Sequence, residues 1–159
     1  AVGAYPVEAV AMMSRIIERT EQDHSYRAII EALDPEPEPN AADAISEAAA
    51  QVATTISAAA IVTFTTSGST ALRAGRRRPR APILLLTSKL STARRFVLLW
   101  GAHCVCTEDI SSLGEMVEKA TSIARQESFA SSGSKLVITA GVPFGTPGAT
   151  NVLRIAWVE

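Results

Sequence analysis

Apolar positions recur along this chain with two alternating spacings, one typical of helices and one typical of buried strands. In residues 7–22 they recur every three or four positions, at Val7, Val10, Met13 and Ile17, which predicts an amphipathic helix with Pro6 in its first turn. Further helical patterns cover 24–33, 41–58, 67–74, 92–100 and 113–128. Short apolar runs predict strands at 60–65, 83–88, 103–107, 136–140 and 152–158.

The alternation of strands and helices predicts an α/β fold. We expect a three-layer sandwich, with a mostly parallel five-stranded sheet and helices on both faces. The segment between the fourth and fifth strands is rich in glycine and proline and is too short to hold a crossover helix. The last strand should therefore be antiparallel to the fourth.

A proline-rich and acidic segment, DPEPEPN at 34–40, divides the chain into two parts. We expect residues 1–38 to form an N-terminal helical segment with its connector, and residues 39–159 to form the α/β domain. The first residue is Ala1 rather than Met, so we expect the chain to be a piece of a longer protein. The apolar stripe of the first helix should then pack against a partner copy.

Charge is distributed unevenly, although the net charge of the chain is only −1. Residues 1–47 hold ten acidic and three basic side chains, whereas residues 48–107 hold eight basic side chains and no acidic one. The run Arg76–Arg80 has no interleaved aromatic residues, which argues against a nucleic-acid site. A solvated loop that pairs with the acidic N-terminal third is the favoured interpretation.

The sequence predicts a cytoplasmic protein with no membrane partner. No apolar stretch reaches the ~18 residues that a membrane span requires, and no signal peptide is present. Cys104 and Cys106 lie in one apolar run and are expected to be reduced thiols. His24 and His103 have no partners at metal-ligand spacing, so we expect no metal site in this chain.

The turn after the first predicted strand is the leading candidate for ligand binding. Hydroxyls and backbone N–H groups at the start of a helix bind phosphate, and nearby positive charge would attract an anion. The alternative is a plain helix cap, because Ser and Thr satisfy unpaired N–H groups at any helix start. A second hydroxyl-rich turn at 87–92 should open at the same sheet edge. The candidate phosphate turn consists of Thr65, Thr66, Ser67, Gly68, Ser69 and Thr70.

Four stretches together resemble pyruvate kinase, in that family's order and spacing. They are AVGAYPVEAVAMM, AIVTFTTSGSTALRAGRRRPRAPILLLTSKLSTARRF, WGAHCV and ITAGVPFGTPGATNVLRI. The similarity covers nearly the whole chain and corresponds to the C-terminal domain of the family plus the helical tail of its catalytic barrel. The resemblance implies a parent enzyme that transfers phosphate from phosphoenolpyruvate to ADP in glycolysis. In such a parent, magnesium and potassium bind in a (β/α)₈ barrel that is not in this chain, so the resemblance implies no catalytic residue here.

What the resemblance implies for this chain is an allosteric and assembly domain within a homotetramer. The phosphate turn matches the family's effector-phosphate site, and an effector-closing loop falls on Gly145, Thr146, Gly148 and Thr150. Members that use fructose 1,6-bisphosphate commonly supply a Trp and an Arg between the third and fourth strands. Here residues 107–135 contain no Trp and only Arg125, which favours a monophosphorylated effector. The alternatives are a stand-alone phospho-ligand-binding protein and a purely structural assembly domain.

Overall fold

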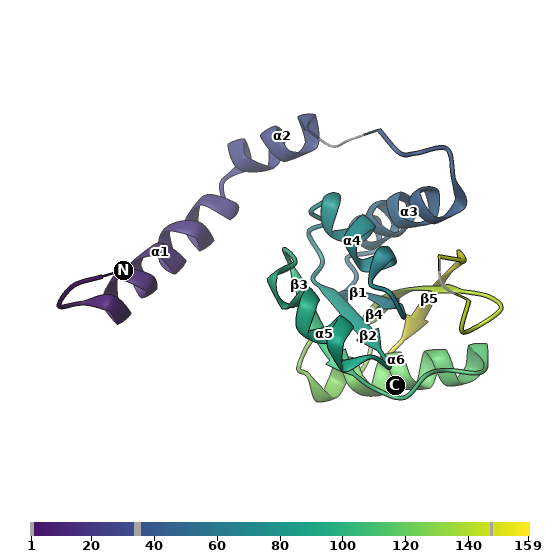
Figure 1. The fold of residues 1–159 in the computed structure, drawn as a ribbon. Coiled ribbons are helices and arrows are strands. Elements are labelled where there is room, and N and C mark those ends of the chain that lie inside the picture. The colour runs from purple at the N-terminus through teal and green to yellow at the C-terminus, as the bar shows by residue number, and fades with distance from the viewer. Residues whose placement is uncertain (1, 34–35, 147) are drawn as a thin grey trace. The chain divides into compact units, whose positions relative to one another are not determined.

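The computed structural model describes residues 2–33, 36–146 and 148–159. The chain divides into two compact units, Ala1–Pro35 and Glu36–Glu159 (Figure 1). The first unit holds helices α1 (Pro6–Glu21) and α2 (His24–Ala32). Pro6 stands at the start of α1, and the Asp23 side chain caps α2 by accepting a hydrogen bond from the Ser25 N–H at 2.8 Å. The apolar stripe of α1 is exposed along its whole length.

The second unit is built on a five-stranded sheet, which confirms the predicted fold class. The strand order is β3-β2-β1-β4-β5, in which the first four strands are parallel and β5 is antiparallel to β4. Each strand lies within two residues of its predicted bounds. The strands are β1 (Ala60–Phe64), β2 (Ile83–Thr87), β3 (Ala102–Cys106), β4 (Lys135–Gly141) and β5 (Thr150–Trp157).

Helices cover both faces of the sheet, as the alternating residues of the strands show (Figure 1). On one face Val62 and Ile138 pack against α6 (Leu113–Gln126). On the other face Ile61 and Val137 pack against α3 (Ala41–Thr55). Helix α4 (Ser69–Arg76) and α5 (Leu90–Arg95) lie on the same side as α3, where Ala71, Leu85 and Phe96 form a smaller cluster.

Three predicted helices differ in detail from the structure. The helix expected at 41–58 ends at Thr55, and Ser57 beyond it has a positive φ of 52°. The helix expected at 67–74 begins two residues later, because Gly68 adopts a left-handed conformation (φ 87°) and acts as the N-cap of α4. The helix expected at 92–100 begins at Leu90 and ends early. After Arg95 it tightens into a 3₁₀ turn over Phe96–Leu98, and Leu99 is already extended.

An ionic cluster joins α3 to α4. The Asp43 carboxylate is almost fully buried and lies 3.7 Å from Arg73 Nε and 3.5 Å from Arg77 Nη2. It also accepts a hydrogen bond from the Glu38 N–H at 2.7 Å, while Arg76 lies 3.8 Å from the Glu38 carboxylate. The basic run therefore pairs with acidic residues of the N-terminal third, in line with the sequence interpretation.

The topology places a switch point between β1 and β4. From β1 the chain moves outward through β2 and β3, then returns to the opposite side of β1 as β4. In open α/β sheets ligands bind at the carboxyl edge beside such a point. Since α4 begins at that edge and ends at the other, the arginines that follow it lie away from the phosphate turn. Across the described residues, no helix has the length and apolar character that a membrane crossing requires.

Candidate phosphate-binding pocket

The candidate phosphate turn has a conformation that only glycine fits at its centre. The Thr65 N–H still pairs with the Leu86 carbonyl at 3.0 Å, so the turn starts directly from the sheet. Gly68 then adopts positive φ, and its N–H donates to Thr65 Oγ1 at 2.9 Å. A Cβ at Gly68 would lie 1.9 Å from Phe96 Cε2. The turn therefore combines a left-handed residue with close packing on an aromatic ring.

Part of the turn's hydrogen-bonding capacity is used within the turn itself. Ser67 Oγ accepts from the Ser69 N–H at 3.4 Å and donates to Ser69 Oγ at 3.1 Å. Thr65 and Ser67 thus satisfy N–H groups at the start of α4, as the helix-cap alternative predicted. Gly68 and Ser69 do not line the pocket described below, unlike the other four residues of the phosphate turn.

Residues of α5 donate hydrogen bonds to backbone carbonyls of the phosphate turn. Thr92 Oγ1 donates to the Thr66 carbonyl at 3.0 Å, and the Arg95 guanidinium donates to the Ser67 carbonyl. The same guanidinium lies over the Phe96 ring, 4.8 Å from its centroid. Arg95 thereby brings positive charge to the turn, which the sequence suggested only through the general excess of basic residues.

The loop after β4 closes against α4. Thr150 Oγ1 and Thr70 Oγ1 form a buried hydrogen bond of 2.6 Å, which ties the end of the loop to the phosphate turn. Asn151 closes the base of the loop, since its side chain accepts from the Val142 N–H at 2.9 Å and donates to the Val142 carbonyl at 2.7 Å. Gly145 and Gly148 both have φ of 79° with open space around them. Glycine is therefore needed there for the backbone conformation of the loop and not for close packing.

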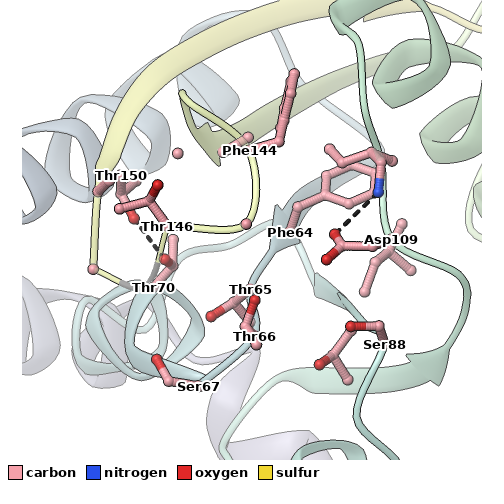
Figure 2. Close-up of a pocket in the computed structure, with 18 of the residues that line it drawn as sticks. Phe64, Thr65, Thr66, Ser67, Thr70, Ser88, Asp109, Phe144, Thr146 and Thr150 are labelled. Carbon is pink, nitrogen blue, oxygen red and sulfur yellow. Dashed lines mark hydrogen bonds between the residues drawn. The ribbon is translucent and has the colours of Figure 1, made fainter.

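These segments surround one pocket at the carboxyl edge of the sheet (Figure 2). In this pocket the turn after β1 meets Thr87 at the end of β2 and Ser88 directly after it, as predicted. The loop after β4 also lines the pocket. The empty volume of the pocket is about 550 Å³, and this includes space open to solvent. A ligand would therefore remain partly in contact with water. The predicted site residues that line the pocket are Thr65, Thr66, Ser67, Thr70, Gly145, Thr146, Gly148 and Thr150.

Other walls of the pocket were not predicted from the sequence. Phe64, Phe144 and Ile110 supply apolar surface, while Glu108 and Asp109 supply carboxylates. In Figure 2 the Asp109 carboxylate points toward the middle of the pocket, across from Thr65. The sequence contained one signal for this acidic wall. Residues 108 and 109 are the first acids after the long stretch without them, and they directly follow a predicted strand, which places them at the same sheet edge.

The electrostatics of the pocket correct one expectation. Instead of eight basic side chains gathered around the turn, no Lys or Arg is found among the described residues that line the pocket. Lys119 stands behind the acidic wall, where its Nζ donates to the Glu108 and Asp109 carbonyls at 2.9 and 3.2 Å. Within the described ranges no group of three or more His, Cys, Asp and Glu could hold a metal ion.

Comparison with known proteins gives a consistent result. Residues 43–156 match the family model described as pyruvate kinase, alpha/beta domain. The chain is 48% identical over 158 residues to a pyruvate kinase of Methylorubrum extorquens, covering 99% of this chain and 33% of the relative. It is 38% identical over 155 residues to a pyruvate kinase of Geobacillus stearothermophilus, covering 98% of this chain and 26% of the relative.

A solved structure agrees with the sequence relatives. A crystal structure of a pyruvate kinase from Cryptosporidium parvum superimposes with a TM-score of 0.85 at 27% identity, covering 100% of this chain and 31% of that one. The chain thus spans about a third or less of the length of these proteins, and its described part contains an open sheet rather than a closed barrel. The chain belongs to the pyruvate kinase family, as its C-terminal α/β domain.

Proposed function

We propose that this chain is the regulatory and assembly domain of a pyruvate kinase and that its phosphate turn binds a small phosphorylated effector. The observation that supports this best is the convergence of three segments on one pocket at the switch point of the sheet. The turn after β1, the turn after β2 and the loop after β4 are separated in sequence, yet all line it. Open α/β folds bind ligands at this position.

The affinity of such a site would be modest. Three or four charge-assisted hydrogen bonds at ~1.5–3 kcal/mol each, less the cost of immobilising the ligand, correspond to a dissociation constant of roughly 10 μM to 1 mM. The shallow pocket supports the weaker part of this range, because a partly hydrated ligand buries less surface. Binding of an anion should weaken as salt is added.

The test is calorimetric titration of the chain and of Ser67→Asp with glucose 6-phosphate, ribose 5-phosphate and AMP. An aspartate at residue 67 can still cap α4, but it places a carboxylate where the phosphate would bind, so binding should be lost. Ser112→Asp is the matched control, because Ser112 is the N-cap of α6 and does not line the pocket. If no phosphorylated ligand binds below several millimolar, or if Ser67→Asp binds as well as the parent chain, the turn is only a helix cap.

For the parent enzyme we infer transfer of phosphate from phosphoenolpyruvate to ADP, in a catalytic barrel that would be the main intramolecular partner of this domain. Magnesium and potassium would be bound in that barrel. The exposed apolar stripe of α1 supports an assembly role, because surfaces of this kind usually meet a partner. We expect a homotetramer in the cytoplasm, without nucleic-acid partners.

Experiments can distinguish two alternative functions from this proposal. A stand-alone phospho-ligand-binding protein would show the same titrations, but the coding region upstream of Ala1 would lack a barrel. A purely structural assembly domain would show no ligand binding and unchanged self-association. The upstream coding sequence and the titration together separate the three.

A further inference from the structure

We infer that Glu108 and Asp109 are specificity determinants, which select an effector with one phosphate and a hydroxylated opposite end and reject a second phosphate. This inference rests on the proposed phosphate binding at residues 65–70. It goes further by assigning a role to the opposite wall of the pocket, where the chain places two carboxylates.

The pocket has two chemically different sides. On one side lie the hydroxyls of Thr65, Thr66 and Ser67, with the Arg95 guanidinium bound to the back of the turn. On the other side lies Asp109, which follows β3 (Figure 2), and its neighbour in the chain, Glu108, also lines the pocket. No basic side chain of the described lining neutralises these two acids within the pocket.

The acidic wall is held in place by its backbone. Lys119 Nζ donates to both the Glu108 and the Asp109 carbonyl, which anchors the segment to α6 without using either carboxylate. Asp109 Oδ1 accepts from the Ile110 N–H at 3.0 Å, and Ile110 itself is buried. The Asp109 side chain is thus oriented, while its second carboxylate oxygen forms no hydrogen bond or ion pair within the described residues.

This arrangement discriminates between ligands by charge. A carboxylate accepts hydrogen bonds from hydroxyl groups, and charge-assisted bonds are about twice as strong as neutral ones. A second phosphate in the same position would meet two like charges, and like-charge contacts at a binding surface weaken binding. The pocket therefore suits a sugar monophosphate, with its phosphate on the turn and its hydroxyls on the acidic wall.

The test uses a pair of ligands that differ by one phosphate, fructose 6-phosphate and fructose 1,6-bisphosphate. Each is titrated against the full chain and against Glu108→Gln, Asp109→Asn and the double variant. Asp109→Asn keeps the acceptor for the Ile110 N–H, and both residues are exposed, so the fold should be retained; circular dichroism checks this. The control is Glu47→Gln with Glu118→Gln, which changes net charge equally but lies outside the pocket.

We expect the chain to bind the monophosphate at least as tightly as the bisphosphate. The double variant should bind the monophosphate a few-fold more weakly and shift the affinity ratio roughly tenfold toward the bisphosphate, while the control leaves the ratio unchanged. A chain that prefers the bisphosphate, or a double variant with an unchanged ratio, would overturn the inference and leave the proposed phosphate site standing. If neither sugar nor inorganic phosphate binds the chain, both proposals fail.

Discussion

At the scale of single residues, Gly68 combines two constraints that can be separated experimentally. Its φ of 87° disfavours any side chain, and a Cβ would also overlap the Phe96 ring. Gly145 has a similar φ of 79° but open space around it. The two glycines therefore differ in packing alone, which makes them a matched pair.

We predict that Gly68→Ala lowers the free energy of unfolding by about 2–4 kcal/mol, from backbone strain together with overpacking against Phe96. Gly145→Ala should cost only the strain, about 1–2 kcal/mol. Urea unfolding followed by circular dichroism measures both values. Equal losses for the two variants would mean that Phe96 moves away without cost and that the close packing is unimportant.

The Thr70–Thr150 hydrogen bond shows how a single contact can join distant segments. The two hydroxyls are 80 residues apart in sequence and fully enclosed. The bond fixes where the loop after β4 meets the start of α4, and hence where the loop lines the pocket. Neither threonine could be assigned this contact from its own neighbours in the chain.

At the scale of elements, the main polar link between α3 and α4 is the cluster around Asp43. The Asp43 and Arg77 side chains are only 2% and 4% exposed. Breaking one partner of a buried ion pair is costly, because the other charge stays buried without compensation. The two helices would then lose a fixed relative position on the sheet.

We predict that Asp43→Ala lowers the free energy of unfolding by roughly 3–5 kcal/mol, because Arg73 and Arg77 both lose their carboxylate partner. Glu47→Ala, one turn further along α3, is the control and should change it by about 0.5 kcal/mol or less. Guanidinium unfolding of both variants measures the difference. An Asp43→Ala loss no larger than that of the control would show that the cluster contributes little.

Helix α1 presents the opposite situation, an element whose apolar side is not covered. Its stripe is 52–76% exposed at Val7, Val10, Met13 and Ile17. Most helices in proteins are stabilised by packing of their apolar face. An amphipathic helix that leaves such a stripe in water loses most of that stabilisation. A partner surface is the simplest physical solution.

At the scale of the whole molecule, we predict that the chain self-associates at micromolar concentration through the α1 stripe. Val10→Ser with Ile17→Ser should shift the chain toward the monomer, whereas Glu8→Ser with Arg15→Ser, on polar positions of the same helix, should not. Sedimentation velocity over a range of concentrations reports this. A chain that is monomeric throughout would count against a partner for α1.

We also predict that this chain alone has no pyruvate kinase turnover. Phosphoryl transfer requires metal-held carboxylates and a positioned cation, and among the described residues no group of three or more His, Cys, Asp and Glu could hold the metal. A coupled assay with phosphoenolpyruvate, ADP, magnesium and potassium tests it. Activity that survives purification and scales with protein concentration would contradict the assignment of the catalytic site to another part of the parent enzyme.

The sequence by itself determined the elements and their order. Alternating spacings of apolar residues located all five strands within two residues, because side-chain burial in strands and helices has a fixed period. Local chemistry also determined the conformation of the candidate phosphate turn, since the hydroxyls, Gly68 and the helix start are neighbours in the chain. The short segment before 150 determined that the last strand is antiparallel.

Only the tertiary structure decided which charges and walls surround that turn. The arginines of 76–80 are close to the turn in sequence, but the eight-residue helix α4 separates them from it, and Arg76 and Arg77 pair instead with Glu38 and Asp43. Conversely, Glu108 and Asp109 reach the pocket because β3 ends at the same edge as β1. Residues that are close in sequence set the local conformation, whereas the strand order determines which residues far apart in sequence meet.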